Sequence, residues 1–81
     1  MKDHLRAGSK KIALKSYNFG GLKSLSREKS DKLYRYFYGH TNQYNTAIEM
    51  KEKAISSGFK NAFIVAYLNG EKISIEKALK N

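Results

Sequence analysis

The sequence predicts one small α+β domain, and three stretches of its 81 residues carry that prediction. An aromatic run at residues 33–38 and an apolar run at residues 62–68 have the length and composition of β-strands. Between them, apolar residues recur at three- and four-residue spacing, which is typical of an amphipathic helix. A chain of this length forms a single domain with a modest core and little room for a deep catalytic cavity.

The aromatic run is the strongest strand signal, and Gly39 ends it. Strand alternation divides its side chains between two faces, with Tyr34, Tyr36 and Tyr38 on one and Leu33, Arg35 and Phe37 on the other. Neither set is simply polar. The strand is therefore expected inside a sheet that uses both faces, one for the core and one for a ligand.

A helix is expected next, from an N-cap at Thr41 or Asn42 to a left-handed cap at Gly58. Its apolar stripe consists of Tyr44, Ala47, Ile48, Lys51, Ala54 and Ile55. Packing of this stripe onto a sheet explains the pattern fully, so no functional role is assigned to it.

The apolar run at residues 62–68 predicts a central strand, or one buried on both faces. Alternation places Ala62, Ile64, Ala66 and Leu68 on one face and Phe63, Val65 and Tyr67 on the other. Asn69-Gly70 predicts a tight turn into a short return strand at residues 71–73. Ser74 then caps a last helix at residues 75–80, with Ile75, Ala78 and Leu79 facing inward.

The first third of the chain is polar, rich in lysine and weakly patterned. Residues 1–16 favour at most short strands around 5–8 and 12–14. Gly20-Gly21 predicts a turn with positive φ, and residues 23–32 read as an irregular edge strand that ends in a turn at Ser30-Asp31. Since two strands do not form a stable sheet, this third must supply the remaining strands.

The residue inventory argues against an enzyme. There is no cysteine, and neither His4 nor His40 has a metal-ligating partner at helical or hairpin spacing. Glu49 and Glu52 share the solvated face of the predicted helix, and residues 19–22 match no phosphate-binding loop. We therefore expect neither catalysis nor a metal or other cofactor.

The formal net charge is +9, of which residues 1–32 carry +6, from nine Lys and Arg against three acidic residues. A basic surface favours nucleic acid, anionic lipid or acidic cell-wall polymers, or it serves solubility alone. No stretch approaches the roughly 20 apolar residues of a membrane span. The first residues are not followed by an apolar run, so no signal peptide is expected. The chain is then either cytoplasmic or a piece of a longer exported protein.

Three elements together resemble the second half of a SPOR domain. They are the strand Leu-Tyr-Arg-Tyr-Phe-Tyr-Gly at residues 33–39, the helix that leads to Gly58-Phe59, and the strand at residues 61–67 with Asn69-Gly70 after it. With Phe19-x-Gly21-Leu22 and residues 71–74 with Ala78, the resemblance covers residues 17–80. It is greatest to SPOR-like domains at the C-termini of Bacteroidetes-type N-acetylmuramoyl-L-alanine amidases and related cell-envelope proteins. It divides the chain into an N-terminal segment, 1–16, and a SPOR-like domain, 17–81.

The resemblance implies a ribonucleoprotein-like (ferredoxin-like) fold with an antiparallel sheet of about four strands. One main helix covers one face, a short helix ends the chain, and the first helix is reduced or absent. It also implies a non-catalytic module of the periplasm or cell envelope that binds peptidoglycan glycan strands and could target an amidase. The glycan-binding positions carried over are Leu33, Arg35, Phe37, Phe63, Val65 and Tyr67.

Two other functions fit the same pattern. One is a small RNA- or DNA-binding domain of ribonucleoprotein-like fold, which the charge permits. It is less favoured, because residues 34–39 lack the Gly-aromatic-Gly pattern of RNA-recognition strands. The other is a protein–protein interaction domain or homodimer, in which a shortened first strand leaves a sheet edge open.

Overall fold

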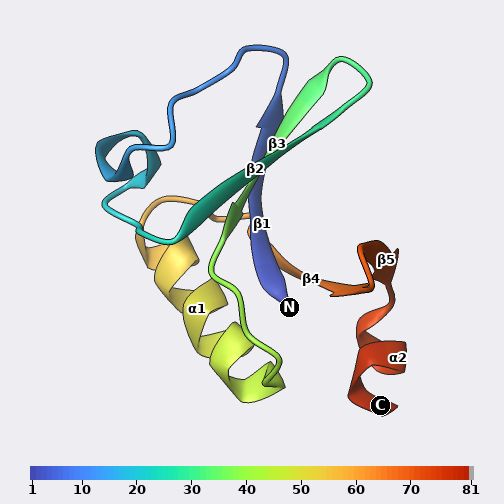
Figure 1. Cartoon of the computed structure of the whole chain (residues 1–81). Coiled ribbons are helices and arrows are strands. Elements are labelled where there is room, and N and C mark those ends of the chain that lie inside the picture. Colours follow the sequence, from blue (N-terminus) through green and yellow to red (C-terminus); the bar gives the residue numbers. More distant parts are fainter. Residues whose placement is uncertain (81) are drawn as a thin grey trace.

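A computed structural model describes residues 1–80, which form an antiparallel sheet of five strands with two α-helices (Figure 1). The strands are β1 (Lys2–Gly8), β2 (Leu25–Ser30), β3 (Leu33–Tyr38), β4 (Phe63–Leu68) and β5 (Glu71–Ile73). The helices are α1 (Tyr44–Ser56) and α2 (Ile75–Lys80), with a 3-10 turn, η1 (Ser16–Phe19), between β1 and β2. The strand order is β2-β3-β1-β4-β5. The α+β prediction is confirmed.

Strand β1 lies at the centre of the sheet, paired with β3 on one side and β4 on the other. It begins at Lys2, earlier than the expected short strand around residues 5–8. The second short strand expected, around residues 12–14, is wrong, because residues 11–15 have no regular structure. The pattern of β1 was weak because two of its buried residues, Asp3 and His4, are polar. A register shift between His4 and Arg6 also interrupts its alternation.

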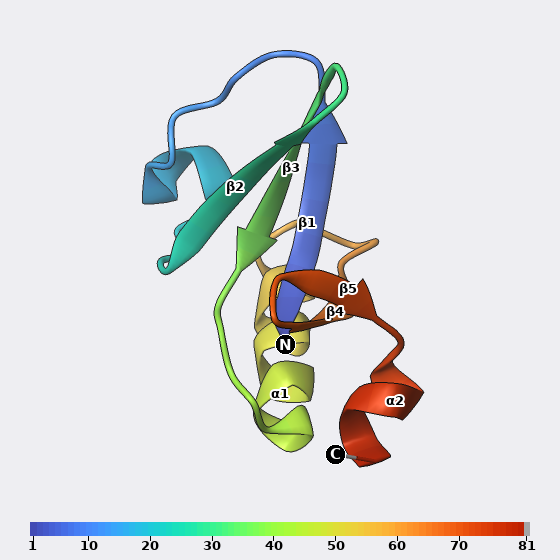
Figure 2. The same ribbon diagram turned by 45° about the vertical axis from the view of Figure 1, so that its right-hand side comes forward.

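Two hairpins flank the central strand, and Figure 2 shows that β4 and β5 turn away from the direction of β2 and β3. The predicted edge strand is β2, whose hairpin with β3 turns at Asp31 with a φ of 56°. The predicted tight turn joins β4 to β5. Asn69 and Gly70 both have positive φ, 53° and 83°, as a two-residue hairpin loop requires.

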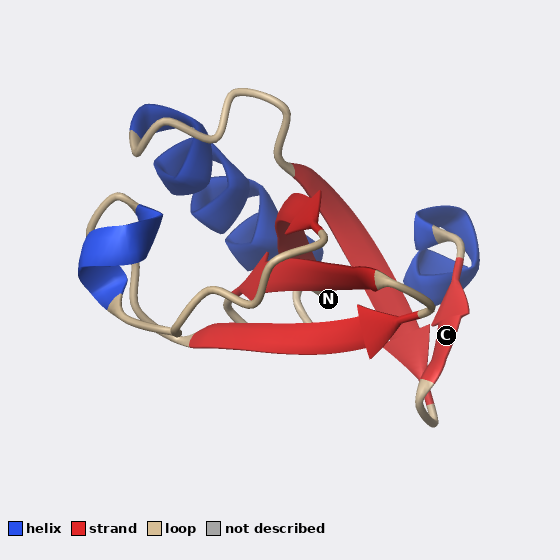
Figure 3. Cartoon of the chain, turned by 90° about the horizontal axis from the view of Figure 1, so that it is seen from above, coloured by secondary structure: helices blue, strands red, loops and turns tan. Residues whose placement is uncertain are grey.

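The core lies between α1, the segment around η1 and one face of the sheet (Figure 3). Its buried residues are Leu5, Phe19, Leu22, Tyr36, Tyr38, Ala54 and Ala62. The three tyrosines of β3 thus point to the helix side, on the face opposite the glycan-binding positions carried over from the SPOR resemblance. The Tyr36 hydroxyl accepts a hydrogen bond from the Ile12 amide at 2.7 Å and donates one to the Lys10 carbonyl at 3.1 Å. These two bonds tie the irregular segment after β1 to the sheet.

The ends of the helices differ in part from the predictions. Helix α1 begins at Tyr44 with Gln43 as N-cap, so both predicted caps are wrong; the Thr41 hydroxyl accepts a hydrogen bond from the Gln43 amide instead, at 3.1 Å. Gly58, just after α1, has the expected positive φ. Ser74 caps α2 as predicted, because its hydroxyl accepts a hydrogen bond from the Lys77 amide. Leu79 is exposed, so its expected inward orientation is wrong.

The join between η1 and the end of α1 yields a stability prediction. Gly20 has a φ of 61°, and a Cβ there would clash with the backbone carbonyl oxygen of Ser57. Gly20→Ala is expected to destabilise the protein by about 2–4 kcal/mol in urea denaturation, from backbone strain plus the clash. Gly21→Ala is the matched control, because Gly21 also has positive φ but open space around its Cβ position. It should cost only about 1–2 kcal/mol. Equal losses for both variants would show that the two segments are not in contact.

Candidate functional site

The sheet face opposite α1 contains a hollow of about 280 Å³. Its lining residues come from all five strands and are His4, Glu28, Ser30, Arg35, Phe37, Phe63, Val65, Tyr67 and Lys72. Five of the six predicted glycan-binding residues are therefore brought together: Arg35, Phe37, Phe63, Val65 and Tyr67. The sixth, Leu33, is exposed on β3 but is not among the residues that line the hollow.

Strand register explains why these side chains meet. His4 on β1 lies opposite Phe37 on β3 and opposite Phe63 on β4, and directly paired residues project to the same face of a sheet. His4 is therefore the centre of the site, although it was not predicted. His4 could have been identified only by predicting that β1 pairs with both aromatic strands. The weak pattern of residues 1–16 did not indicate that pairing.

Aromatic rings form the floor and one wall of the hollow. The His4 ring stacks on Phe63 with 4.6 Å between centroids and 18° between planes. Phe37 meets His4 edge-on at 5.5 Å and Tyr67 edge-on at 6.4 Å. Phe37 is only 1% exposed and Val65 is also buried, whereas Phe63 is 44% exposed. Phe37 and Val65 thus support the site from below, and Phe63 presents a ring to solvent.

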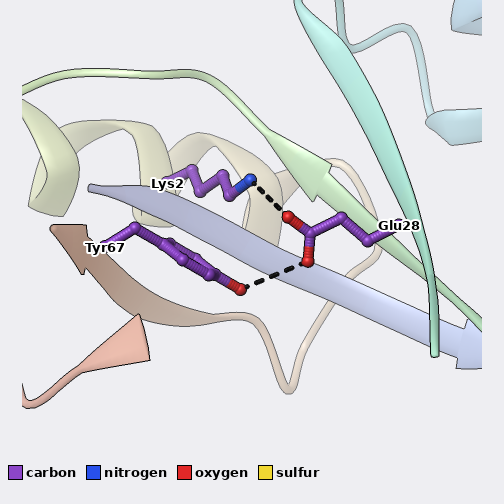
Figure 4. A network of polar contacts seen from close by, with 3 residues as sticks. All are labelled: Lys2, Glu28 and Tyr67. Carbon is purple, nitrogen blue, oxygen red and sulfur yellow. Dashed lines mark hydrogen bonds and ion pairs between the residues drawn. The ribbon is translucent and has the colours of Figure 1, made fainter. Parts of the chain in front are cut away.

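A polar bridge crosses the same face between β2, β1 and β4 (Figure 4). Lys2 Nζ lies 3.3 Å from Glu28 Oε1, and the Tyr67 hydroxyl donates a hydrogen bond to Glu28 Oε2 at 3.4 Å. The same ammonium lies 4.4 Å from the centre of the Phe37 ring and 4.6 Å from that of Tyr67. Burial, followed by the Glu28 carboxylate, raises the pKa of Tyr67, so its hydroxyl stays a donor at neutral pH. Both oxygens of Glu28 are therefore engaged.

Arg35 and His4 lie side by side in the hollow, with Arg35 Nη1 3.4 Å from His4 Nε2. Burial lowers the pKa of His4, and the positive charges of Arg35 and Lys72 lower it further. The imidazole is consequently neutral at pH 7. Because a guanidinium can only donate, Nε2 of His4 is the acceptor and Nδ1 carries the proton. The arrangement holds the guanidinium beside the aromatic surface.

The hollow presents aromatic rings together with charged and hydrogen-bonding side chains. Within residues 1–80, no group of three His, Cys, Asp or Glu side chains could hold a metal ion. Neither helix in this part of the chain has the length and apolar character needed to cross a membrane. A half-exposed ring beside an arginine suits a ligand that offers both a flat apolar face and hydrogen-bond acceptors.

Comparison with known protein families, curated proteins and solved structures finds no match to this chain.

Proposed function

We propose that this chain is a non-catalytic module that binds the glycan strands of peptidoglycan on its open sheet face. The observation that carries the proposal is the pairing of Phe63 with Arg35 in one hollow. A sugar ring packs its C–H face on an aromatic side chain, and its hydroxyl oxygens accept hydrogen bonds from a guanidinium. The hollow offers both groups, with His4 in contact with each of them.

The strand order supports the same reading. The antiparallel strand order β2-β3-β1-β4 and the helix between β3 and β4 are features that support a ribonucleoprotein-like (ferredoxin-like) fold, which the SPOR resemblance implies. In this reading the single turn η1 stands in place of the first helix, and β5 and α2 are additions. Membership of a SPOR-like group, a place in the periplasm or cell envelope, and a role in targeting an amidase belong to the proposal.

The surface favours sugar over nucleic acid. Single-stranded RNA on a ribonucleoprotein-like sheet stacks two or three bases on exposed rings. Here Phe37 is only 1% exposed beneath Lys2, which leaves Phe63 and the half-buried Tyr67 on this face. A glycan strand needs fewer stacked rings and more hydrogen-bond donors.

Pairing of two copies through a sheet edge receives less support. A shortened first strand was expected to leave one edge of the sheet unpaired. Strand β1 is instead central and paired on both sides. The long edge strand is β2, which carries Arg27, Glu28 and Lys29. Charged side chains on an edge strand oppose pairing with another chain.

Co-sedimentation with purified sacculi tests the proposal. Sacculi are used before and after digestion by an amidase that removes stem peptides, at low and at high salt, with RNA of similar length as competitor. We expect more protein to sediment with digested sacculi, and most of that binding to survive high salt. Absence of binding to both preparations, or equal displacement by RNA, would contradict the proposal.

Two substitutions in the hollow should weaken glycan binding without unfolding the protein. Phe63→Ala removes the exposed ring and Arg35→Ala removes the donor; each is expected to lower affinity about three- to tenfold. The melting temperature should change little, because both side chains are exposed. Tyr17→Ala is the matched control, since Tyr17 is 79% exposed but lies on η1, away from the hollow. A large loss of stability in Phe63→Ala, or equal loss of binding in Tyr17→Ala, would contradict this site.

A further inference from the structure

We propose that a second surface of the protein, here called the basic surface, docks on a bilayer of anionic phospholipid. It consists of exposed residues on β1, on the segment after β1 and on η1: Arg6, Lys10, Lys11, Leu14, Lys15 and Tyr17. None of these residues lines the hollow of the candidate glycan site. The proposal therefore does not depend on glycan binding.

The charge of the basic surface has one sign. Six Lys and Arg, and no acidic residue, occur between Asp3 and Glu28. The ion pair found within residues 1–80, Lys2–Glu28, involves none of the four cations of the basic surface. Figures 1 and 2 show that the segment after β1 lies at the same end of the molecule as the β2-β3 turn, which adds the exposed Lys32. This end attracts a layer of negative charge.

An open hollow in the basic surface suits the phosphate of a lipid headgroup. It has a volume of about 340 Å³, and its lining contains two cations, a hydroxyl group and no acidic residue: Arg6, Gly8, Ser9, Lys10 and Ile12. A phosphodiester offers one negative charge and several acceptor oxygens. A guanidinium binds such oxygens through paired hydrogen bonds, and a lysine adds a mobile point charge.

The basic surface and the glycan hollow face different ways. Arg6 pairs directly with Tyr36, so it projects to the face on which Tyr36 enters the core. The glycan hollow lies on the opposite face and shares no lining residue with the hollow at Arg6. A bilayer and a glycan strand can therefore be bound at the same time.

Two apolar side chains are exposed among the lysines. Leu14 is 38% exposed and Tyr17 is 79% exposed. Every residue from 13 to 18 is exposed, whereas Ile12 packs against the core and Phe19 is completely buried. Charge that serves solubility alone does not call for exposed apolar side chains beside it. Their place among the lysines indicates a partner that is both anionic and apolar.

The segment that carries these side chains is anchored to the sheet. The Ile12 amide donates a hydrogen bond to the Tyr36 hydroxyl at 2.7 Å, and Arg27 Nη1 donates one to the Ile12 carbonyl at 2.8 Å. The buried Phe19 holds the other end of the segment. Because the backbone is already fixed, less conformational entropy is lost when the surface binds.

The exposed side chains favour a bilayer over nucleic acid. Proteins that bind single strands stack successive bases on several aromatic rings. Tyr17 is the one exposed ring in residues 9–24, and Leu14 has no aromatic face for a base. In a bilayer, a tyrosine lies at the level of the headgroups, a leucine enters the acyl boundary, and lysines meet the phosphates.

Flotation with lipid vesicles tests the proposal. Vesicles of phosphatidylcholine alone are compared with vesicles of equal parts phosphatidylcholine and phosphatidylglycerol, at physiological salt. We expect binding to the anionic vesicles only. The double variant Lys10→Gln/Lys15→Gln should weaken it about 25-fold, since each lysine near an anionic surface contributes about fivefold.

The matched control is Lys77→Gln/Lys80→Gln, which removes two exposed charges from α2, away from the basic surface (Figure 1). It should change vesicle binding by less than about twofold, because distant charges are screened. Equal losses in the two double variants, or equal binding to both kinds of vesicle, would overturn the proposal, as would no binding to either. Sedimentation with sacculi at high salt should stay unchanged in both variants, so this failure is distinct from failure of glycan binding.

A fluorescent probe distinguishes a bilayer from nucleic acid. The chain has no tryptophan, so Tyr17→Trp introduces a single one. Its emission should shift to the blue with anionic vesicles, whereas that of Tyr44→Trp, at the start of α1, should not. Absence of the shift in Tyr17→Trp would contradict docking through this ring. Tighter binding to single-stranded RNA than to vesicles, lost in Lys10→Gln/Lys15→Gln, would assign the basic surface to nucleic acid instead.

Discussion

Replacing Phe19 by alanine is expected to destabilise the protein by about 3–5 kcal/mol, which is a large fraction of the stability of so small a domain. The Phe19 side chain is completely buried, and its ring lies 5.2 Å from Tyr36 and 6.2 Å from Phe59, measured between centroids. It enters the core from η1, the 3-10 turn between β1 and β2. Urea denaturation followed by circular dichroism measures the loss.

The matched control for this prediction is again Tyr17→Ala in the same 3-10 turn. Its ring is mostly exposed, so the expected change is within about 0.5 kcal/mol. If Phe19→Ala were as mild as the control, the segment around η1 would not be packed on the sheet, and the core would lie only between α1 and the strands.

Replacing Asp3 by asparagine is expected to stabilise the protein at pH 7 by about 2–3 kcal/mol. Asp3 is completely buried on β1, and neither carboxylate oxygen has a hydrogen-bond partner among the described residues. Burial raises the pKa of its carboxyl from 3.8 to about 6, although the charges of Lys51 and the N-terminus oppose the shift. The ionised form is therefore disfavoured in the folded state, and an amide of similar shape removes that cost.

The sign of the pH dependence follows from the raised pKa. Between about pH 4 and 6 the folded protein binds more protons at Asp3 than the unfolded chain, so this residue makes stability fall as pH rises. His4 acts oppositely, because its lowered pKa makes stability rise with pH up to about 6.5. The difference in the free energy of unfolding between wild type and Asp3→Asn isolates the contribution of Asp3 to this pH dependence.

Denaturation at pH 4, 5, 6 and 7 measures that difference. The stabilisation by Asp3→Asn should be small at pH 4 and reach its full value above pH 6. Asp31→Asn, in the exposed turn between β2 and β3, should leave stability nearly unchanged. A destabilised Asp3→Asn at pH 7 would show that the carboxylate has a partner in the folded protein.

Most of the fold could be predicted where side-chain type and burial agree. Strand β3 has the predicted bounds and faces, and the turn at Asn69-Gly70 and the Ser74 cap depend on local chemistry alone. Strand β1 could not be predicted as the centre of the sheet, because polarity and burial disagree at Asp3 and His4. Only pairing with β3 and β4 buries these residues, and such pairing is a tertiary effect that a local pattern does not contain.

The sequence predicted most of the residues that line the candidate site, but not the positions of Lys2 and Lys72. Alternation placed Arg35 with Phe37 on one strand and Phe63 with Tyr67 on another, the SPOR resemblance placed both pairs on one face, and the hollow gathers all four. Alternation could not show that Phe37 is covered by Lys2, or that Lys72 on β5 reaches the same hollow. Both features depend on how far the outer strands curl over the face, which strand alternation does not determine.

We propose that glycan strands bind to the sheet face containing the hollow, and neither to residues 9–15 nor to α1. A titration of the 15N-labelled protein with soluble stripped strands, followed by two-dimensional NMR, tests it most directly. The amide signals of His4, Arg35, Phe37, Phe63 and Tyr67 are expected to shift together, while those of the outer face of α1, such as Glu49 and Glu52, stay in place. Shifts confined to residues 9–15 or to α1, or no shifts at all, would contradict the claim.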